Sequence, residues 1–406
     1  MNILIVSQYF WPERFKINDI AQGLIEKGHA VTVLTSIPNY PVGKFFNGYG
    51  LLGPYFENHN GIKVVRVPQF PRGNKKGIML ALNYLSFMLI ASILGPILLL
   101  RKKFDRIFIY QLSPVTAAFP AVVMKWIKKC KLYFWVTDLW PESLVAAGVT
   151  TSPRILSLVG RFVKFMLDQS DLILLSSKGF TKNMIERGID RSKLEYWPQW
   201  GEKLFYETLI EENKLPRNEV PEGFVIMFAG NIGTSQSFEI IVEAAERLSS
   251  YTDIHWVILG DGLKRAWIEK EVIDRGIEDC FHLLGSRPMD SIPYYYSLSS
   301  ALLVSLKKDP IFSITLPTKV QSYLASGKPI IVSVDGEAAD IVNENFCGVS
   351  CRASSVEDLV DGVLKLYSKT PEEREKMGAN GREFFFKNFE RELLLTKLEN
   401  LMNLKN

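Results

Sequence analysis

The first half of the chain alternates short apolar runs with amphipathic stretches. The runs are mostly β-branched or aromatic, and they are apolar throughout, which is typical of parallel strands buried on both faces. Helical patterns such as Asn18–Lys27 and Ser113–Lys128 lie between several of them, which predicts βαβ units in a doubly wound sheet. The predicted strands are Ile3–Val6, Ala30–Thr35, Val64–Val67, Arg106–Tyr110, Leu132–Val136, Leu172–Ser176 and Leu194–Trp197.

The same pattern restarts after a polar segment, Glu211–Gly223, whose two prolines indicate a linker. We therefore predict two consecutive Rossmann-like domains, residues 1–198 and 199–388, and a C-terminal helical segment over residues 389–406. Such sheets bind ligands beyond the carboxyl ends of their strands, so the active site is expected in the cleft between the domains. The second set of predicted strands is Phe224–Ala229, Ile254–Leu259, Phe281–Leu284, Ala301–Ser305, Pro329–Val332 and Gly348–Ser350.

Composition agrees with a globular protein of about two domains, since the 406 residues are 47% hydrophobic and 23% charged. The N-terminus enters a predicted strand directly, without a basic region or cleavage site, so no secretory signal is expected. The cysteines are scattered and lack a second ligand pair for zinc, which favours reduced thiols in a cytosolic protein. They are Cys130, Cys280, Cys347 and Cys351.

Charge is divided unequally along the chain. Through residue 198 there are 25 Lys and Arg against 12 Asp and Glu, a net charge of +13, and the remainder carries −9, which gives +4 overall. This asymmetry favours an anionic partner for the first half, although lysines can also serve solubility alone. No nucleic-acid-binding motif accompanies the charge, so a membrane surface is the expected partner.

An uncharged segment of 23 residues, Ile78–Leu100, is long enough to span a bilayer. Basic residues flank both ends, and the strands before and after it are predicted to share one sheet, so we expect that it does not span. Two interpretations stay open: a core helix bent at Gly95-Pro96, or a helix in the membrane interface with its basic ends on phosphate headgroups. The basic and aromatic stretch Pro153–Leu167 favours the interfacial interpretation.

Three positions carry candidate chemistry. The loop from Gly230 to Gly233 joins a strand to a helix, where glycines and free N–H groups can approach a phosphate, although any tight turn uses the same residues. Lys319 is predicted in the first turn of a helix opened by Pro317, as a diphosphate partner or as an ordinary surface lysine. Asp138 follows a buried strand, as a catalytic carboxylate or as a cap.

Several motifs are missing from the sequence. None of the four histidines has a neighbour at metal-ligand spacing, and there is no Asp-x-Asp pair, Walker loop, Gly-x-Ser-x-Gly or Gly-x-Gly-x-x-Gly. We therefore predict no metal site and no cofactor.

Seven motifs occur in order along both halves of the chain: "ILIVSQYFWPE", "GLIEKGHAVTVLTSIPNYPVGK", "VTDLWPESL", "FAGNIGTSQSFEIIVEAAERL", "VILGDG", "LPTKVQSYLASGKPI" and "GEAADIV". In these motifs the chain resembles glycosyltransferase family 4, of GT-B architecture, along its whole length. Within the family it is most similar to bacterial O-antigen and capsule transferases, particularly N-acetyl-L-fucosamine transferases. The resemblance implies metal-independent transfer from a UDP-sugar to a polyprenyl-diphosphate-linked acceptor, by a cytoplasmic protein peripheral to the inner face of the membrane.

The resemblance also implies residue roles. The first domain would bind the acceptor and the membrane, the second the nucleotide sugar, and the final helix would pack back on the first domain. The implied catalytic residues are Asp138, Lys319 and Arg287. Those implied for the nucleotide sugar are Gly230, Asn231, Gly233, Asp261, Ser313, Thr318, Ser322 and Glu337, and those for the acceptor are Pro12, Glu13 and Asn18.

One departure from the family concerns two glutamates, which usually face the donor sugar and hold the ribose hydroxyls. Their positions here are Ile314 and Ser322, so Ser313, Ser322 or Glu337 would have to substitute. The loss leaves room for two other functions: a non-catalytic nucleotide- or lipid-binding scaffold, or a UDP-sugar epimerase of similar fold.

Overall fold

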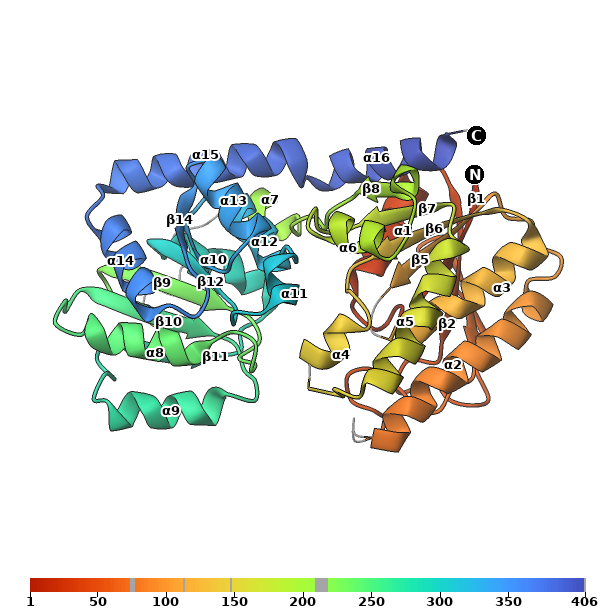
Figure 1. Ribbon diagram of the computed structural model, residues 1–406, viewed down its shortest axis with the longest axis horizontal. Helices are drawn as coiled ribbons and strands as arrows, with labels where there is room; N and C mark the ends of the chain where they lie inside the picture. Colours follow the sequence, from red (N-terminus) through yellow and green to blue (C-terminus); the bar gives the residue numbers. More distant parts are fainter. Residues whose placement is uncertain (74–76, 112–113, 147, 209–217, 405–406) are drawn as a thin grey trace. The chain divides into compact units, whose positions relative to one another are not determined.

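The computed structural model describes residues 1–73, 77–111, 114–146, 148–208 and 218–404. The chain divides into two compact units: unit 1 is residues 1–197 with 395–406, and unit 2 is residues 198–394. Each unit is a sheet flanked by helices (Figure 1). Most of the predicted linker, residues 211–217, lies outside the described residues.

Unit 1 is built on an eight-stranded sheet in the order β3-β4-β2-β1-β5-β6-β7-β8. All neighbouring strands are parallel except the antiparallel pair β3 and β4. Strand β3 was not predicted, because three of its four residues are polar and it lies at the sheet edge. The strands are β1 (Asn2–Val6), β2 (Ala30–Ser36), β3 (Phe56–His59), β4 (Ile62–Val67), β5 (Arg106–Gln111), β6 (Lys131–Val136), β7 (Leu172–Leu175) and β8 (Leu194–Tyr196).

The helices of unit 1 fill the connections between these strands. A 3₁₀ turn (Val115–Ala118) precedes α3, so the predicted helix 113–128 is regular only from Phe119, and Ser113 lies outside the described residues. The helices in these connections are α1 (Lys16–Glu26), α2 (Gly77–Leu98), α3 (Phe119–Lys128), α4 (Glu142–Ala146), α5 (Pro153–Asp168) and α6 (Phe180–Glu186). Helix α16 (Arg391–Asn403) follows unit 2 in the chain and belongs to unit 1 from residue 395.

Helix α2 is one continuous helix, with Pro96 inside its last turn. It connects β4 to β5, which belong to the same sheet, and it packs on α3. The ammonium of Lys128 in α3 donates to the carbonyls of Leu99, Leu100 and Lys102, and so satisfies acceptors just beyond the helix end. Among the described residues α2 is the one helix that is long and apolar enough to cross a membrane. Only 22% of its most apolar window is buried inside the protein.

The exposed side of α2 is therefore apolar. Its exposed large side chains recur every three or four residues, which places them along one face of the helix. Helices α3 and α5 lie beside it (Figure 1) and add exposed Trp126, Ile155 and Leu158, with Trp126 against Phe165 at 6.2 Å between ring centroids. We call the α2 set the apolar stripe: Ile78, Leu82, Leu85, Leu89, Ile93 and Ile97.

The end of α16 packs against unit 1. Nε2 of His29 lies 3.1 Å from the carboxylate of Glu399, Tyr133 donates to the carbonyl of Leu401, and Arg106 donates to that of Met402. These contacts tie the end of α16 to β5, to β6 and to the residue before β2.

Unit 2 repeats the architecture with six parallel strands in the order β11-β10-β9-β12-β13-β14. All six were predicted, because β9, β12 and β13 are buried along their whole length and leave an uninterrupted apolar run in the sequence. The strands are β9 (Phe224–Ala229), β10 (Ile254–Leu259), β11 (Phe281–Gly285), β12 (Ala301–Ser305), β13 (Ile330–Ser333) and β14 (Gly348–Cys351).

Helix α12 begins after Pro317, as predicted. Pro317 is its N-cap, and Gly327 ends it with φ +71, a left-handed value that favours glycine. The helices of unit 2 are α7 (Leu204–Glu207), α8 (Phe238–Arg247), α9 (Arg265–Asp274), α10 (Ile292–Ser297), α11 (Pro310–Ser313), α12 (Thr318–Ser326), α13 (Glu337–Glu344), α14 (Val356–Tyr367) and α15 (Pro371–Asn388).

Candidate functional site

A cavity of about 510 Å³ opens in unit 2 at the carboxyl ends of β9 and β10. Gly230 and Gly260, which follow these strands, have φ +138 and +139, and a Cβ on Gly260 would overlap the carbonyl of Gly230. The two turns therefore need glycine to approach one another. The predicted residues that line this cavity are Gly230, Asn231, Asp261, Arg287, Thr318, Lys319 and Ser322.

Lys319 projects from the first turn of α12 into the cavity wall. Its ammonium lies 3.4 Å from the centroid of the Phe228 ring, and a Cβ on Gly230 would be only 2.8 Å from it. No carboxylate of the described residues forms an ion pair with Lys319, and burial lowers the pKa of its ammonium to about 7. The free site thus contains a buried lysine next to the glycine turn, without a carboxylate partner among the described residues.

Arg287 is placed differently from Lys319. Its guanidinium donates to the carboxylate of Glu219 and to the hydroxyl of Tyr295, and these contacts raise its pKa. Arg287 lines the cavity, but part of its charge is neutralised by Glu219 in the structure.

Glu202 is a cavity residue that the sequence did not indicate. It precedes α7, and its carboxylate accepts a hydrogen bond from the hydroxyl of Ser322 at 3.2 Å. Glu202 lies 120 positions from Ser322, in no recognisable motif, so only the fold brings it to the position where the family's second glutamate is missing. If Ser322 substitutes for that glutamate, as predicted, it does so with the carboxylate of Glu202 beside it.

Three other predicted nucleotide-sugar residues do not line the cavity. Gly233 donates its N–H to the side chain of Gln236, within the turn before α8. Ser313 ends α11, and its carbonyl lies so close to Gly336 that a Cβ there would overlap it. Glu337 begins α13 and is 9% exposed. Their assignment to the nucleotide sugar stays a prediction.

In unit 1, Asp138 follows β6 at the carboxyl edge of the sheet, as predicted from its strand. Its carboxylate accepts a hydrogen bond from Ser143 at 2.7 Å, and its carbonyl accepts one from Gln111. These contacts fix the turn before α4. They fit both interpretations drawn from the sequence, the catalytic carboxylate and the cap.

The predicted acceptor residues lie in the loop after β1. Pro12 precedes Glu13, whose buried carboxylate accepts hydrogen bonds from the N–H groups of Phe10, Asn39 and Tyr40. Burial raises the pKa of Glu13 to about 7 in spite of these bonds. Asn18 donates to the carbonyl of Glu13 at 2.7 Å. Glu13 therefore holds the loops after β1 and β2 together, and any effect it has on an acceptor passes through them.

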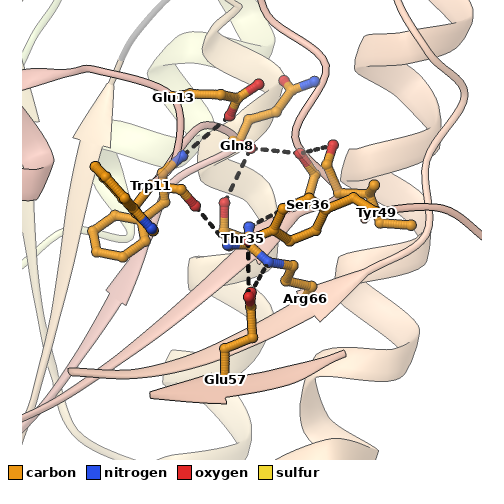
Figure 2. Close-up of polar contacts among 10 residues, drawn as sticks. Gln8, Trp11, Glu13, Thr35, Ser36, Tyr49, Glu57 and Arg66 are labelled. Carbon is orange, nitrogen blue, oxygen red and sulfur yellow. Dashed lines mark hydrogen bonds and ion pairs between the residues drawn. The ribbon is translucent and has the colours of Figure 1, made fainter. Parts of the chain in front are cut away.

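A second network lies beneath this loop (Figure 2). Arg66 is fully buried and donates to the carboxylate of Glu57 and to the carbonyls of Ser36 and Trp11. Ser36 in turn donates to the carbonyl of Gln8 at 2.6 Å. The carboxyl ends of β1, β2 and β4 are thus joined by a polar network whose charges are paired.

No group of three or more His, Cys, Asp or Glu side chains that could hold a metal ion occurs in the described part of the chain. The four cysteines are free, and burial raises the pKa of the Cys347 and Cys351 thiols to about 12.

Two family models match the chain, one for each half. The model "Glycosyl transferase 4-like domain" matches residues 16–200, and "Glycosyl transferases group 1" matches residues 210–384. The putative colanic acid biosynthesis glycosyl transferase WcaI of Escherichia coli K12 is 24% identical over 386 residues, which are 89% of this chain and 91% of WcaI.

Solved structures share the fold at lower identity. HepE of Anabaena, solved with UDP-glucose, superposes with a TM-score of 0.68 at 14% identity and full coverage of both chains. WaaG, a glycosyltransferase involved in lipopolysaccharide biosynthesis, gives a TM-score of 0.67 at 13% identity over 99% of this chain and all of WaaG. The prediction of two Rossmann-like domains in a GT-B fold is confirmed. With both family models matched in order, one on each domain, the chain is a glycosyltransferase of the GT-B fold.

Proposed function

We propose that this glycosyltransferase moves a sugar from a UDP-sugar to a polyprenyl-diphosphate-linked acceptor during surface-polysaccharide synthesis, without a metal ion. The observation that carries the donor half of this proposal is the position of Lys319. A cation in the first turn of a helix faces the positive end of the helix dipole, and burial without a counter-charge adds a desolvation cost. Both costs are removed when an anion binds there.

A diphosphate is the anion that this site suits best. The turn at Gly230 and Asn231 can bring backbone N–H groups to a phosphate, and the first turn of α12 offers its own free N–H groups. Lys319 would then neutralise the charge that develops on the leaving UDP, and Arg287 would assist once Glu219 shares its guanidinium. HepE, which has the same fold, was solved with UDP and with UDP-glucose.

The rest of the cavity suits a nucleoside. Apolar and aromatic side chains form part of its wall, with Phe205 stacked on Tyr296 at 5.4 Å between ring centroids, and these would pack beside the base. The paired Glu202 and Ser322 offer a carboxylate and a hydroxyl on the same wall, which together suit the two hydroxyls of a ribose.

The acceptor would bind to unit 1, where Asp138 stands at a strand end as a base or a sugar ligand. The apolar stripe and the basic residues near it would hold unit 1 at an anionic membrane surface, on the cytoplasmic side where nucleotide sugars are available. The relative WcaI is named for colanic acid biosynthesis, which supports a polysaccharide product. The sequence resemblance makes N-acetyl-L-fucosamine our choice of sugar.

The test is product analysis. Purified protein is incubated in excess EDTA with a GlcNAc-diphosphate-polyprenyl acceptor and a panel of UDP-sugars, including UDP-N-acetyl-L-fucosamine. The mass of the lipid product is then measured by mass spectrometry. We expect a mass increase of one sugar, with N-acetyl-L-fucosamine the best donor. UDP binding without transfer from any donor would indicate the scaffold. Conversion of the UDP-sugar in the absence of acceptor would indicate an epimerase, and transfer that returns only with added magnesium would contradict metal independence.

A further inference from the structure

Arg72 lies at the carboxyl end of the unit 1 sheet, between β4 and α2. Its guanidinium carbon stands over the rings of three tyrosines, at 5.8 Å from the centroid of Tyr9, 5.1 Å from Tyr40 and 5.5 Å from Tyr84. These tyrosines come from the loops after β1 and β2 and from α2 itself, so three separate segments of the fold surround one cation. We call Arg72 and these three tyrosines the arginine cage.

The charge in the arginine cage is not balanced by an opposite charge among the described residues, although its guanidinium is hydrogen-bonded to the Tyr9 and Tyr84 hydroxyls. One terminal N–H of Arg72 donates to the hydroxyl of Tyr9, while its Nε is buried without a hydrogen-bond partner. No carboxylate among the described residues forms an ion pair with it. Arg66, six positions earlier in the chain, is the opposite case, since its donors reach Glu57 and two carbonyls (Figure 2). The fold pairs one arginine fully and leaves the other, which is partly exposed, for an external anion.

Phosphate is the anion that fits these groups. Guanidinium binds phosphate oxygens through its N–H donors, and no carboxylate of the described residues forms an ion pair with the terminal nitrogens of Arg72. Burial raises the pKa values of the Tyr9 and Tyr84 hydroxyls above their usual range, so both stay protonated at neutral pH. Rings stacked around the guanidinium also keep it in place, which lowers the ordering cost of binding.

The neighbourhood of the cage indicates what is attached to the phosphate. Tyr84 belongs to α2, and the first three turns of that helix carry exposed Ile78, Met79, Leu82 and Leu85. A phosphate held by Arg72 would therefore stand at the head of the apolar stripe. This is the arrangement that a lipid phosphate requires, with an anionic head and a long hydrocarbon chain beside it.

We propose that the arginine cage binds the phosphate of an isoprenoid-linked diphosphate, whose hydrocarbon chain lies along the apolar stripe of α2. The inference deepens the proposed function, because it rests on a lipid-linked acceptor and assigns the residues of unit 1 that recognise its phosphate. It is independent of the donor site, since Arg72 and Lys319 belong to different units.

The experiment uses full-length protein and farnesyl diphosphate as the probe, with farnesol and inorganic diphosphate as its two halves. Affinities are measured for the parent, Arg72→Met, Arg72→Lys and Tyr84→Phe, and for Lys182→Met as a control that removes one exposed charge from α6 of the same unit. UDP affinity and the thermal unfolding midpoint are measured on every sample. We expect Arg72→Met to lower the affinity for farnesyl diphosphate at least tenfold. Arg72→Lys and Tyr84→Phe should lower this affinity by a smaller factor. Farnesol and UDP affinities should be unchanged.

Several results would overturn the inference: no binding of farnesyl diphosphate to the parent, equal binding by Arg72→Met, or an equal loss in Lys182→Met. Equal affinity for inorganic diphosphate and farnesyl diphosphate would also overturn it, because the site would then take a free anion. If Arg72→Met does not fold, the affinities of Arg72→Lys and Tyr84→Phe for farnesyl diphosphate provide the test, and affinities equal to that of the parent would overturn the inference. A parent that binds farnesyl diphosphate through Arg72 but does not bind UDP would leave this inference standing and contradict the proposed donor.

Discussion

The buried ammonium of Lys319 destabilises the free protein through its desolvation, and we propose that a bound anion offsets this cost. We expect Lys319→Met to lower sugar transfer roughly a hundredfold, since one charge-assisted contact in the transition state contributes about 2–4 kcal/mol. Steady-state kinetics measure this. Lys307→Met is the matched control, because Lys307 is 44% exposed and pairs with Glu239 outside the cavity. Transfer by Lys319→Met at the rate of the control would remove Lys319 from the reaction.

The pKa of Lys319 also predicts a pH dependence of folding. Burial lowers the pKa from its ordinary value to about 7, so the cost of a buried cation is fully present below pH 7 and is relieved as pH rises above 7 and the folded protein loses the proton. Lys319→Met should therefore raise the unfolding midpoint of the free protein most at pH 6 and least near pH 9. Thermal unfolding of both proteins across this range tests the sign, and an advantage that grows with pH would contradict it.

The same pKa predicts the pH dependence of nucleotide binding. A diphosphate binds the protonated form of Lys319, so UDP affinity should fall between pH 7 and pH 9 in the parent, as the fraction of protonated free protein falls. Calorimetric titration in two buffers of different ionisation enthalpy should show proton uptake on binding near pH 8. In Lys319→Met both the uptake and this pH dependence should be absent, and their persistence would place the titrating group elsewhere.

Glu202 allows a test of the ribose subsite. If its carboxylate accepts hydrogen bonds from ribose, the parent should bind 2′-deoxy-UDP about tenfold more weakly than UDP, which is the loss expected for a charge-assisted hydrogen bond. Glu202→Gln keeps the shape of the side chain and an acceptor for Ser322. It should bind UDP more weakly and discriminate less between the two nucleotides. Undiminished discrimination would mean that Glu202 positions Ser322 without touching ribose.

At the scale of elements, α2 is both a packed helix and an exposed apolar surface. Its buried side packs through Phe87, Ala91 and Gly95, and its exposed side includes Leu89 at 54% and Ile93 at 64%. Leu89→Ser with Ile93→Ser should weaken binding to vesicles with anionic lipids at least tenfold, because each apolar side chain contributes about 1.5 kcal/mol when it leaves water. Sedimentation with vesicles measures the loss.

The control for this pair is Ile273→Ser, which removes an isoleucine of equal exposure, 65%, from α9 in unit 2. It should leave vesicle binding unchanged. The unfolding midpoint of the double variant should also stay close to that of the parent, because both side chains are exposed. If the double variant sediments with vesicles as well as the parent does, the stripe is not a membrane surface.

At the scale of the whole molecule, charge should orient the protein. The first 198 residues carry +13 and the remainder −9, and each basic residue near an anionic surface contributes about 1 kcal/mol. Replacing Arg101, Lys102 and Lys103 with Glu should lower vesicle binding and transfer to a lipid acceptor, while sparing transfer to a short soluble analogue. High salt should weaken but not abolish binding of the parent, because the apolar contribution is not screened. Binding that is unaffected by the triple change would contradict a charged docking surface.

The sequence by itself determined the strands, their parallel arrangement and the two-domain order. Strands such as β9 and β13 are buried on both faces, so they appear as uninterrupted apolar runs that can be recognised without a structure. It also placed the glycine turn after a strand and Lys319 in the first turn of a helix, because Pro317 and Gly327 delimit α12 locally. The mostly polar edge strand β3 was missed, since such a strand leaves no apolar run.

Only the tertiary structure decided which distant side chains meet. Glu202 reaches Ser322 across 120 positions, and Arg72 is surrounded by tyrosines from three segments. It also showed that Arg287 is paired with Glu219 while Lys319 is not, and that α2 turns an apolar face outward. Periodicity and capping are local properties that a sequence displays directly. Charge pairing and the exposure of one helix face depend on which elements pack together, so they exist only once the chain has folded.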